Sequence, residues 1–183
     1  MIIQIVGTNG AGKSTVVRAV MAVGACHRVQ EDKKLLGYYL TVPQVRRQVF
    51  VVGPYEAPTG GCDAIKSLGK TYDLIGCAVR ANKSVLFEGA SHTMNQTRGP
   101  VFVTEVGVPF VVVLLTTPLG VCLDGIDARR AERGASSLVS MEHVRSSYKR
   151  AQNYAARMRE VGAGVVRVSR EAAPGAVLEL LRG

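Results

Sequence analysis

Apolar residues along the chain form two alternating patterns: short continuous runs, and longer segments with apolar positions every three or four residues. Continuous β-branched runs are typical of strands that are buried on both faces of a parallel sheet. Two of the runs flank Pro43 and could pair as a hairpin. The predicted strands cover residues 2–6, 38–42, 48–52, 84–89, 109–117 and 164–169.

Segments with helical spacing separate these runs. The predicted helices cover residues 14–23, 72–82, 119–134, 140–160 and 176–181. The longest helix carries an apolar seam made of Met141, Val144, Tyr148, Ala151, Ala155 and Met158. Strands that alternate with helices predict an α/β fold with three layers, in which helices cover both faces of a mostly parallel sheet of about five strands. No repeat or linker interrupts the pattern, so we expect residues 1–183 to form a single domain.

The charge of the chain adds information about its partners. Lysine and arginine total 23 against 14 acidic residues, a formal net charge of +9. Such an excess favours polyanionic partners, chiefly nucleic acid or phosphorylated ligands, although a basic protein without such a partner has the same composition. The longest apolar run is well short of the ~18 residues that a membrane span needs, so no membrane partner is expected. Four scattered cysteines are expected to be reduced thiols in a cytoplasmic protein.

Residues 7–15, GTNGAGKST, match the phosphate-binding pattern G-x-x-x-x-G-K-[ST]. The match directly follows the first predicted strand and opens the first predicted helix, which is the context that this P-loop requires. Its glycines let backbone N–H groups surround a phosphate, and the helix N-terminus adds partial positive charge. We therefore expect a nucleoside triphosphate to bind here. The predicted contacts are Gly7, Asn9, Gly10, Ala11, Gly12, Lys13, Ser14 and Thr15.

Two of these side chains have chemical roles in phosphoryl transfer. Lys13 can reach the β- and γ-phosphates, and the Ser14 hydroxyl can ligate Mg²⁺. A further acid is expected near the metal at the end of a neighbouring strand, and Glu88 has that position. Glu88 could instead be a surface carboxylate, but the P-loop favours a role at the metal or at the reacting hydroxyl. ATP and Mg²⁺ are the expected cofactors, although the motif does not distinguish ATP from GTP.

Other classes of P-loop protein have less support. A GTPase would carry an N-K-x-D motif, but Asn82 and Lys83 are followed by Ser84 and Val85. A transporter-type ATPase would carry a signature like L-S-G-G-Q, which the sequence lacks. The chain is also too short to include the helical lid domain of the mechanical ATPases. A small kinase is therefore the favoured class.

Residues 126–134, IDARRAERG, supply arginines of the kind that small kinases close over the phosphates. Arg129, Arg130 and Arg133 are spaced so that at least two guanidinium groups share a helix face. Such groups can stabilise the charge of the transition state. The alternative is a solvated helix end rich in arginine. The pattern does not single out one of the three residues.

The order of these segments resembles the small P-loop kinases, a group that includes polynucleotide-kinase-like and zeta-toxin-like phosphotransferases. The resemblance lies in residues 116–134 with the helix and strand that follow them. Residues 52–65 (VGPYEAPTGGCDAI) and 85–89 (VLFEG), together with 2–15, are similar to phage-encoded kinases in particular. Some of these are 5-hydroxymethyluridine DNA kinases. The resemblance implies phosphoryl transfer from ATP to a modified pyrimidine in DNA, with DNA as the partner and the host cytoplasm as the location of a phage protein.

The same resemblance implies an acceptor side. It maps onto Tyr55, Gly60, Gly61, Cys62, Asp63 and Glu88. Asp63 is the candidate base that takes the alcohol proton, since it follows two glycines that allow close approach to a substrate and it opens a helix-like segment. Two alternatives remain: Asp63 is only the N-cap of that helix, or Glu88 is the base.

Tyr55 and the acceptor itself are less determined. Tyr55 could stack on an extruded or single-stranded base, or it could be a half-buried tyrosine at a strand end. The enzyme could instead phosphorylate free nucleosides, nucleotides or another small alcohol. A DNA-binding or regulatory ATPase without a phosphoryl acceptor is a third reading. No pattern predicts the oligomeric state.

Overall fold

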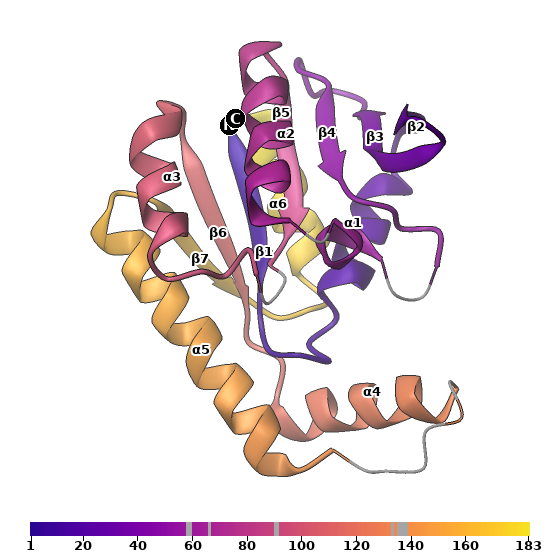
Figure 1. Cartoon of the computed structure of the whole chain (residues 1–183), viewed down its shortest axis with the longest axis vertical. Coiled ribbons are helices and arrows are strands. Elements are labelled where there is room, and N and C mark those ends of the chain that lie inside the picture. Colours follow the sequence, from indigo (N-terminus) through magenta and orange to yellow (C-terminus); the bar gives the residue numbers. More distant parts are fainter. Residues whose placement is uncertain (58–59, 66, 90–91, 133, 135–138) are drawn as a thin grey trace.

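The computed structural model describes residues 1–57, 60–65, 67–89, 92–132, 134 and 139–183. Within these ranges seven strands form one sheet in the order β2-β3-β4-β5-β1-β6-β7, with helices packed around it (Figure 1). The strands are β1 (Ile2–Val6), β2 (Ala25–Glu31), β3 (Lys34–Thr41), β4 (Val49–Val52), β5 (Ser84–Glu88), β6 (Phe110–Leu115) and β7 (Gly164–Val168). The helices are α1 (Lys13–Met21), α2 (Leu68–Arg80), α3 (Arg98–Val106), α4 (Leu119–Ala131), α5 (Met141–Glu160) and α6 (Ala173–Arg182), with a short 3₁₀ helix, η1 (Gly61–Ala64).

Five neighbouring strands, from β4 to β7 in the sheet order, are parallel to one another. The central strand β1 has apolar side chains on both of its faces, and all of them are buried. Ile2 packs into a cluster with α2, α3 and α5, whereas Ile3 packs into a second cluster with α1, α4 and α6. Because successive residues of a strand point to opposite faces, helices must cover both sides of this sheet. The predicted three-layer α/β fold is confirmed.

The sheet has seven strands where about five were expected. The difference lies at one edge, where β2 and β3 pair as an antiparallel hairpin and β3 pairs antiparallel with β4. The proposed hairpin around Pro43 is therefore the β3–β4 pair. Strand β2 is exposed along almost its whole length and carries polar residues on both faces. An edge strand of this kind lacks the apolar alternation by which strands are found in a sequence.

The helices follow the predicted segments closely, with one addition. Four members of the predicted α5 seam are buried, namely Val144, Ala151, Ala155 and Met158, while Met141 and Tyr148 are half-buried. Ser147 and Tyr154 are also buried on this helix. Helix α3 was not predicted. Its first turn contains Gly99 and Pro100, which read as helix breakers in a sequence although proline is well tolerated in a first turn.

The parallel strands place their carboxyl ends at one edge of the sheet. Strand β1 lies between β5 and β6, so the ends at Val6, Glu88 and Leu115 are neighbours. Ligands of open α/β sheets bind outside the carboxyl ends of the strands. This edge is therefore where functional side chains are expected, and the P-loop begins directly after Val6.

Candidate active site

The P-loop turns directly from β1 into helix α1. Gly12 is the residue before the helix, and its φ of 89° lies in the left-handed region that a side chain rarely adopts. A Cβ atom added there would also collide with the Arg170 side chain. The N–H groups of the first turn of α1 have no partners inside the helix and are available to an anion. The local sequence therefore builds a phosphate-binding turn.

Lys13 lies across this turn. Its Nζ donates hydrogen bonds to the carbonyl oxygens of Gly7 at 3.1 Å and Thr8 at 3.2 Å. Burial lowers the pKa of the Lys13 ammonium group, while the carboxylates of Glu88 and Asp63 act in the opposite direction. An ammonium group has three N–H donors, so beyond these two carbonyl partners Lys13 can still bind phosphate oxygens.

Ser14 and Glu88 are brought together from α1 and the end of β5. Ser14 Oγ donates a hydrogen bond of 2.7 Å to Glu88 Oε2, and the Glu88 residue is only 4% exposed. Burial raises the pKa of Glu88, and the Ser14 hydrogen bond and the charges of Lys13 and Arg18 oppose this shift. The structure thus joins the two predicted metal ligands in one contact.

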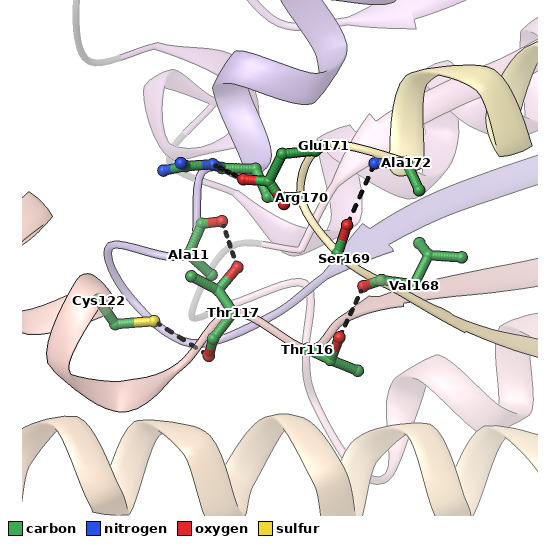
Figure 2. A network of polar contacts seen from close by, with 9 residues as sticks. All are labelled: Ala11, Thr116, Thr117, Cys122, Val168, Ser169, Arg170, Glu171 and Ala172. Atoms are coloured by element: carbon green, nitrogen blue, oxygen red, sulfur yellow. Dashed lines mark hydrogen bonds and ion pairs between the residues drawn. The ribbon is translucent and has the colours of Figure 1, made fainter.

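Two residues that are distant in the chain form hydrogen bonds with the backbone of the P-loop. Figure 2 shows that Thr117, just past β6, donates its hydroxyl to the Ala11 carbonyl oxygen at 3.0 Å. The Asn9 N–H donates to Ser147 Oγ on α5, also at 3.0 Å. The Ser147 side chain is buried in the face that α5 presents to the sheet. These contacts fix the loop before any ligand arrives.

One cavity of about 770 Å³ collects most of the predicted site residues. Its lining includes the P-loop residues Asn9, Gly10, Gly12, Lys13, Ser14 and Thr15, together with Glu88, Asp63, Arg129 and Arg130. Two further P-loop residues, Gly7 and Ala11, are buried and do not line the cavity. The predicted nucleotide-binding segment and the two candidate carboxylates therefore share one space.

The acceptor-side prediction is only partly matched. Asp63 is exposed on η1 and lines the cavity. The residue Tyr55 is 5% exposed and packs in the apolar cluster beside α1, so it offers no open ring face to a base in this conformation. The structure therefore gives no support to the stacking role, and Tyr55 is buried more deeply than the half-buried tyrosine of the alternative reading.

At Gly60 and Gly61 the missing side chain allows other atoms of the protein to approach the backbone closely. A Cβ atom at Gly60 would overlap the Pro54 carbonyl oxygen, and one at Gly61 would overlap Glu88 Oε1. Gly61 also has a φ of 70°, which favours glycine. Both glycines are buried and neither lines the cavity. The contacts of these glycines in the structure are with the protein itself, so their predicted contact with substrate is not matched.

Asp63 does not cap helix α2. That helix begins at Leu68, and its N-cap is Ser67, whose side chain accepts a hydrogen bond from the Lys70 N–H. Asp63 lies inside η1, whose own N-cap is Gly60. The capping alternative is therefore wrong, since Asp63 lies within η1 and the N-cap of α2 is another residue, Ser67.

The candidate lid arginines are at the end of α4. Arg129 Nε donates to the Gly125 carbonyl oxygen at 3.0 Å, which fixes the side chain along its own helix. The charge of Arg129 contributes to lowering the pKa of Lys13, so this guanidinium acts on the P-loop lysine. Arg130 also lines the cavity. Arg133, the third candidate, lies outside the described residues.

The family model described as "AAA domain" matches residues 2–154 of the chain. The chain belongs to this family, as a P-loop kinase domain. It is 30% identical to a "5-hmdU DNA kinase" of Pseudomonas phage PaMx11, over 98% of this chain and 96% of that protein. The protein is therefore a kinase, a P-loop phosphotransferase.

A solved structure supports the fold of this kinase. The shikimate kinase of Acinetobacter baumannii, solved in complex with shikimate, matches with a TM-score of 0.50 and 18% identity. The match covers 99% of this chain and 90% of that one. At this identity the likeness concerns the fold alone.

Three basic residues that line the cavity of the kinase were missed from the sequence. Arg18, His143 and Arg170 all line the cavity. Arg18 follows Ser14 by four positions on α1, so helical spacing places both on one face. Arg170 comes just after the carboxyl end of β7, at the sheet edge where ligands bind, and its side chain lies beside the P-loop in Figure 2. Both signals were present in the sequence.

The oxygen donors of the site fit a magnesium ion. A hydroxyl and a carboxylate already in contact match the few protein ligands that Mg²⁺ uses beside substrate phosphates and water. Among the described residues there is no cluster of three or more His, Cys, Asp and Glu side chains that could hold a metal alone. Within the same part of the chain, no helix has the length and apolar character needed to cross a membrane.

Proposed function

We propose that this kinase transfers the γ-phosphoryl group of ATP to a primary hydroxyl, namely the 5-hydroxymethyl group of hydroxymethyluracil in DNA. The observation that carries the proposal is the single cavity in which Lys13 and Ser14 lie with the carboxylates of Glu88 and Asp63. The DNA acceptor is supported by the likeness to the phage DNA kinase and by the net charge of +9.

The reaction requires little covalent chemistry from the protein. The hydroxyl oxygen of the acceptor forms a bond to the γ-phosphorus, the bond from that phosphorus to the β–γ bridging oxygen breaks, and ADP leaves. The proton of the hydroxyl passes to a carboxylate. Because phosphoryl transfer has a loose transition state, catalysis consists mainly of positioning and charge stabilisation. Lys13 and Arg129 are assigned to that charge.

The two carboxylates have different surroundings and are assigned different tasks. Glu88 accepts the hydrogen bond from Ser14, and the pair would hold Mg²⁺. A bound Mg²⁺ would neutralise charge on the β- and γ-phosphate oxygens. Asp63 is exposed and lines the cavity, which suits a base that must reach an incoming hydroxyl. We therefore assign the proton acceptor to Asp63.

The acceptor is tested with ATP labelled on its γ-phosphate. The reactions contain duplex DNA with hydroxymethyluracil, the same sequence as a single strand, the unmodified duplex, and free hydroxymethyldeoxyuridine with its nucleotide. Label on modified DNA alone is expected. Label only on the free nucleoside or nucleotide would refute the DNA acceptor. Release of ADP without any labelled acceptor would refute phosphoryl transfer to an alcohol.

The salt dependence of binding gives an independent test of DNA as partner. For duplex DNA, each phosphate contact contributes about −0.9 to the slope of the logarithm of the binding constant against the logarithm of the salt concentration. We expect affinity for the modified duplex to fall steeply between low and moderate salt. A flat dependence would contradict a DNA-binding role for the positive charge.

A further inference from the structure

Arg18 connects the nucleotide side of the site to the segment proposed for the acceptor. It projects from α1, one turn after Ser14, and it lines the active-site cavity. Its Nε donates to the Tyr55 carbonyl oxygen at 3.0 Å, and its Nη2 donates to the Ala57 carbonyl oxygen. One guanidinium group therefore holds two backbone carbonyls of a segment that is 37 and 39 residues away in the chain.

The segment Pro54–Ala57 has few other regular contacts. Its backbone belongs to no helix or strand. The Tyr55 N–H donates to Tyr38 Oη at 3.3 Å, and the Pro54 carbonyl oxygen accepts the Gly61 N–H. Glu56 forms an exposed ion pair with Arg28 of the β2–β3 hairpin at 3.0 Å. Of these two arginines, Arg18 lines the cavity and Arg28 does not.

The shape of the arginine side chain matters for this contact. A guanidinium presents several N–H donors in a rigid planar fork, whereas a lysine ammonium is a single centre on a flexible stem. The two carbonyls are two residues apart on one segment, so a fork can hold both at once. Ser14 and Arg18 also share a face of one helix, so the metal-ligand side and the Pro54–Ala57 segment are attached to the same rigid element.

We propose that Arg18 is a positioning residue, which fixes the segment Pro54–Ala57 to the P-loop helix and thereby sets where the acceptor hydroxyl lies relative to the γ-phosphate. This inference rests on the proposed function, because it takes the segment leading to Asp63 as the acceptor side. The segment continues through Gly61, which packs on Glu88, to Asp63 on η1. A displaced segment would therefore misplace the proposed base.

The test compares Arg18→Gln, Arg18→Lys and Arg28→Gln with the unchanged protein. Arg28→Gln is the matched control, since it removes an arginine that contacts the same segment from the exposed side. Steady-state rates are measured with the acceptor that the unchanged protein phosphorylates in the labelled-ATP panel. We expect Arg18→Gln to lower kcat/KM for the acceptor by ~10–100-fold, because small misplacements of reacting groups are costly. The nucleotide Kd should stay within about twofold.

Arg18→Lys separates charge from geometry. It retains the cation but not the fork, so we expect it to restore at most a few-fold of the lost kcat/KM. Arg28→Gln should change kcat/KM by no more than about fivefold, as is typical of exposed ion pairs. Full recovery in Arg18→Lys, or an equal loss in Arg28→Gln, would overturn the positioning role.

Amide hydrogen exchange supplies a readout that needs no acceptor. The Tyr55 N–H donates to Tyr38 Oη, and the Gly61 N–H donates to the Pro54 carbonyl oxygen. Both N–H groups should exchange faster in both Arg18 variants than in Arg28→Gln. Unchanged exchange would overturn the proposal, and so would faster exchange with unchanged acceptor kinetics. A failure of the proposed function looks different, since the unchanged protein would then leave hydroxymethyluracil DNA unlabelled. Thermal unfolding of each variant checks that the fold is retained.

Discussion

The donor side and the proposed acceptor side of this kinase share one cavity but differ in which of their residues reach it. On the donor side, Asn9, Gly10 and Gly12–Thr15 line the cavity, while Gly7 and Ala11 lie beneath them as part of the same turn. On the acceptor side, Asp63 and Glu88 reach the cavity, but Tyr55, Gly60 and Gly61 are buried in packing contacts.

The difference follows from how each side is built. The P-loop is a short local structure whose residues are adjacent in the chain, so their spacing determines their geometry. The proposed acceptor side is assembled from β5, η1 and the segment after β4, and Arg18 contacts that segment from another helix. Glycine and proline in such a segment indicate an unusual backbone conformation. They do not indicate whether a substrate or a neighbouring side chain packs against the glycine.

The largest expected effect separates the two carboxylates. Asp63→Asn should lower kcat by ~10²–10⁴-fold with little change in nucleotide affinity, because a positioned base contributes that much. Glu88→Gln should also lower kcat and, in addition, raise the Mg²⁺ concentration needed for half-maximal activity. Rates measured across a Mg²⁺ titration distinguish the two results. Asp73→Asn, an exposed aspartate on α2, is the control, and near-normal turnover in Asp63→Asn would return the role of base to Glu88.

The two described lid arginines should differ. Arg129→Ala is expected to lower kcat by ~10²–10³-fold, the size of effect known for donors that stabilise transition-state charge. Arg130→Ala should cost less, because Arg129, whose charge acts on Lys13, is the residue assigned to the charge of the transition state. Initial rates at saturating nucleotide test this order, with the exposed Arg150→Ala on α5 as control. A larger loss in Arg130→Ala would reverse the assignment.

Gly61→Ala tests the packing beneath the acceptor side. The added Cβ atom would overlap Glu88 Oε1, and the alanine would have to keep the backbone φ of 70°. We therefore expect a loss of ~1–3 kcal/mol in unfolding free energy. Denaturant unfolding measures this loss. Gly175→Ala in α6 is the matched control, since no atom lies within 4 Å of the added Cβ. That substitution should be neutral or stabilising by up to ~1 kcal/mol, and an equal loss in both variants would contradict the contact with Glu88.

The smallest effect concerns stability and pH. Burial raises the pKa of Glu88 in the folded protein, whereas the unfolded chain keeps the ordinary value of about 4.3. Ionised Glu88 therefore destabilises the nucleotide-free fold at pH values above its folded pKa. Glu88→Gln should raise the Tm at pH 8 by about 2–4 °C, which corresponds to about 1 kcal/mol in a chain of this size.

That gain in Tm should shrink as the pH falls through the folded pKa of Glu88, because the native side chain is then neutral as well. Thermal unfolding across the pH range measures the difference between the two proteins. A gain that stays constant with pH, or a lower Tm at pH 8, would contradict the raised pKa.

The elements that sequence patterns missed share a physical cause. Strand β2 is exposed on both faces and α3 begins with Gly99 and Pro100, so neither has the periodic burial that a pattern detects. Among site residues, Arg170 and Arg18 carry positional signals that become informative only once the strand end or the helix face is recognised. The hydrogen bond between Asn9 and Ser147 joins residues 138 positions apart, which no local pattern predicts.

The sequence by itself determined that this protein is an α/β kinase with its nucleotide site directly after the first strand. It could do so because buried strands, helical seams and the P-loop are local structures, in which the backbone geometry determines the spacing of the residues along the chain. Only the tertiary structure decided that Glu88 meets Ser14, that Tyr55 is buried, and that Arg18 holds the segment before Asp63. These contacts join distant segments, and packing among such segments depends on the whole fold.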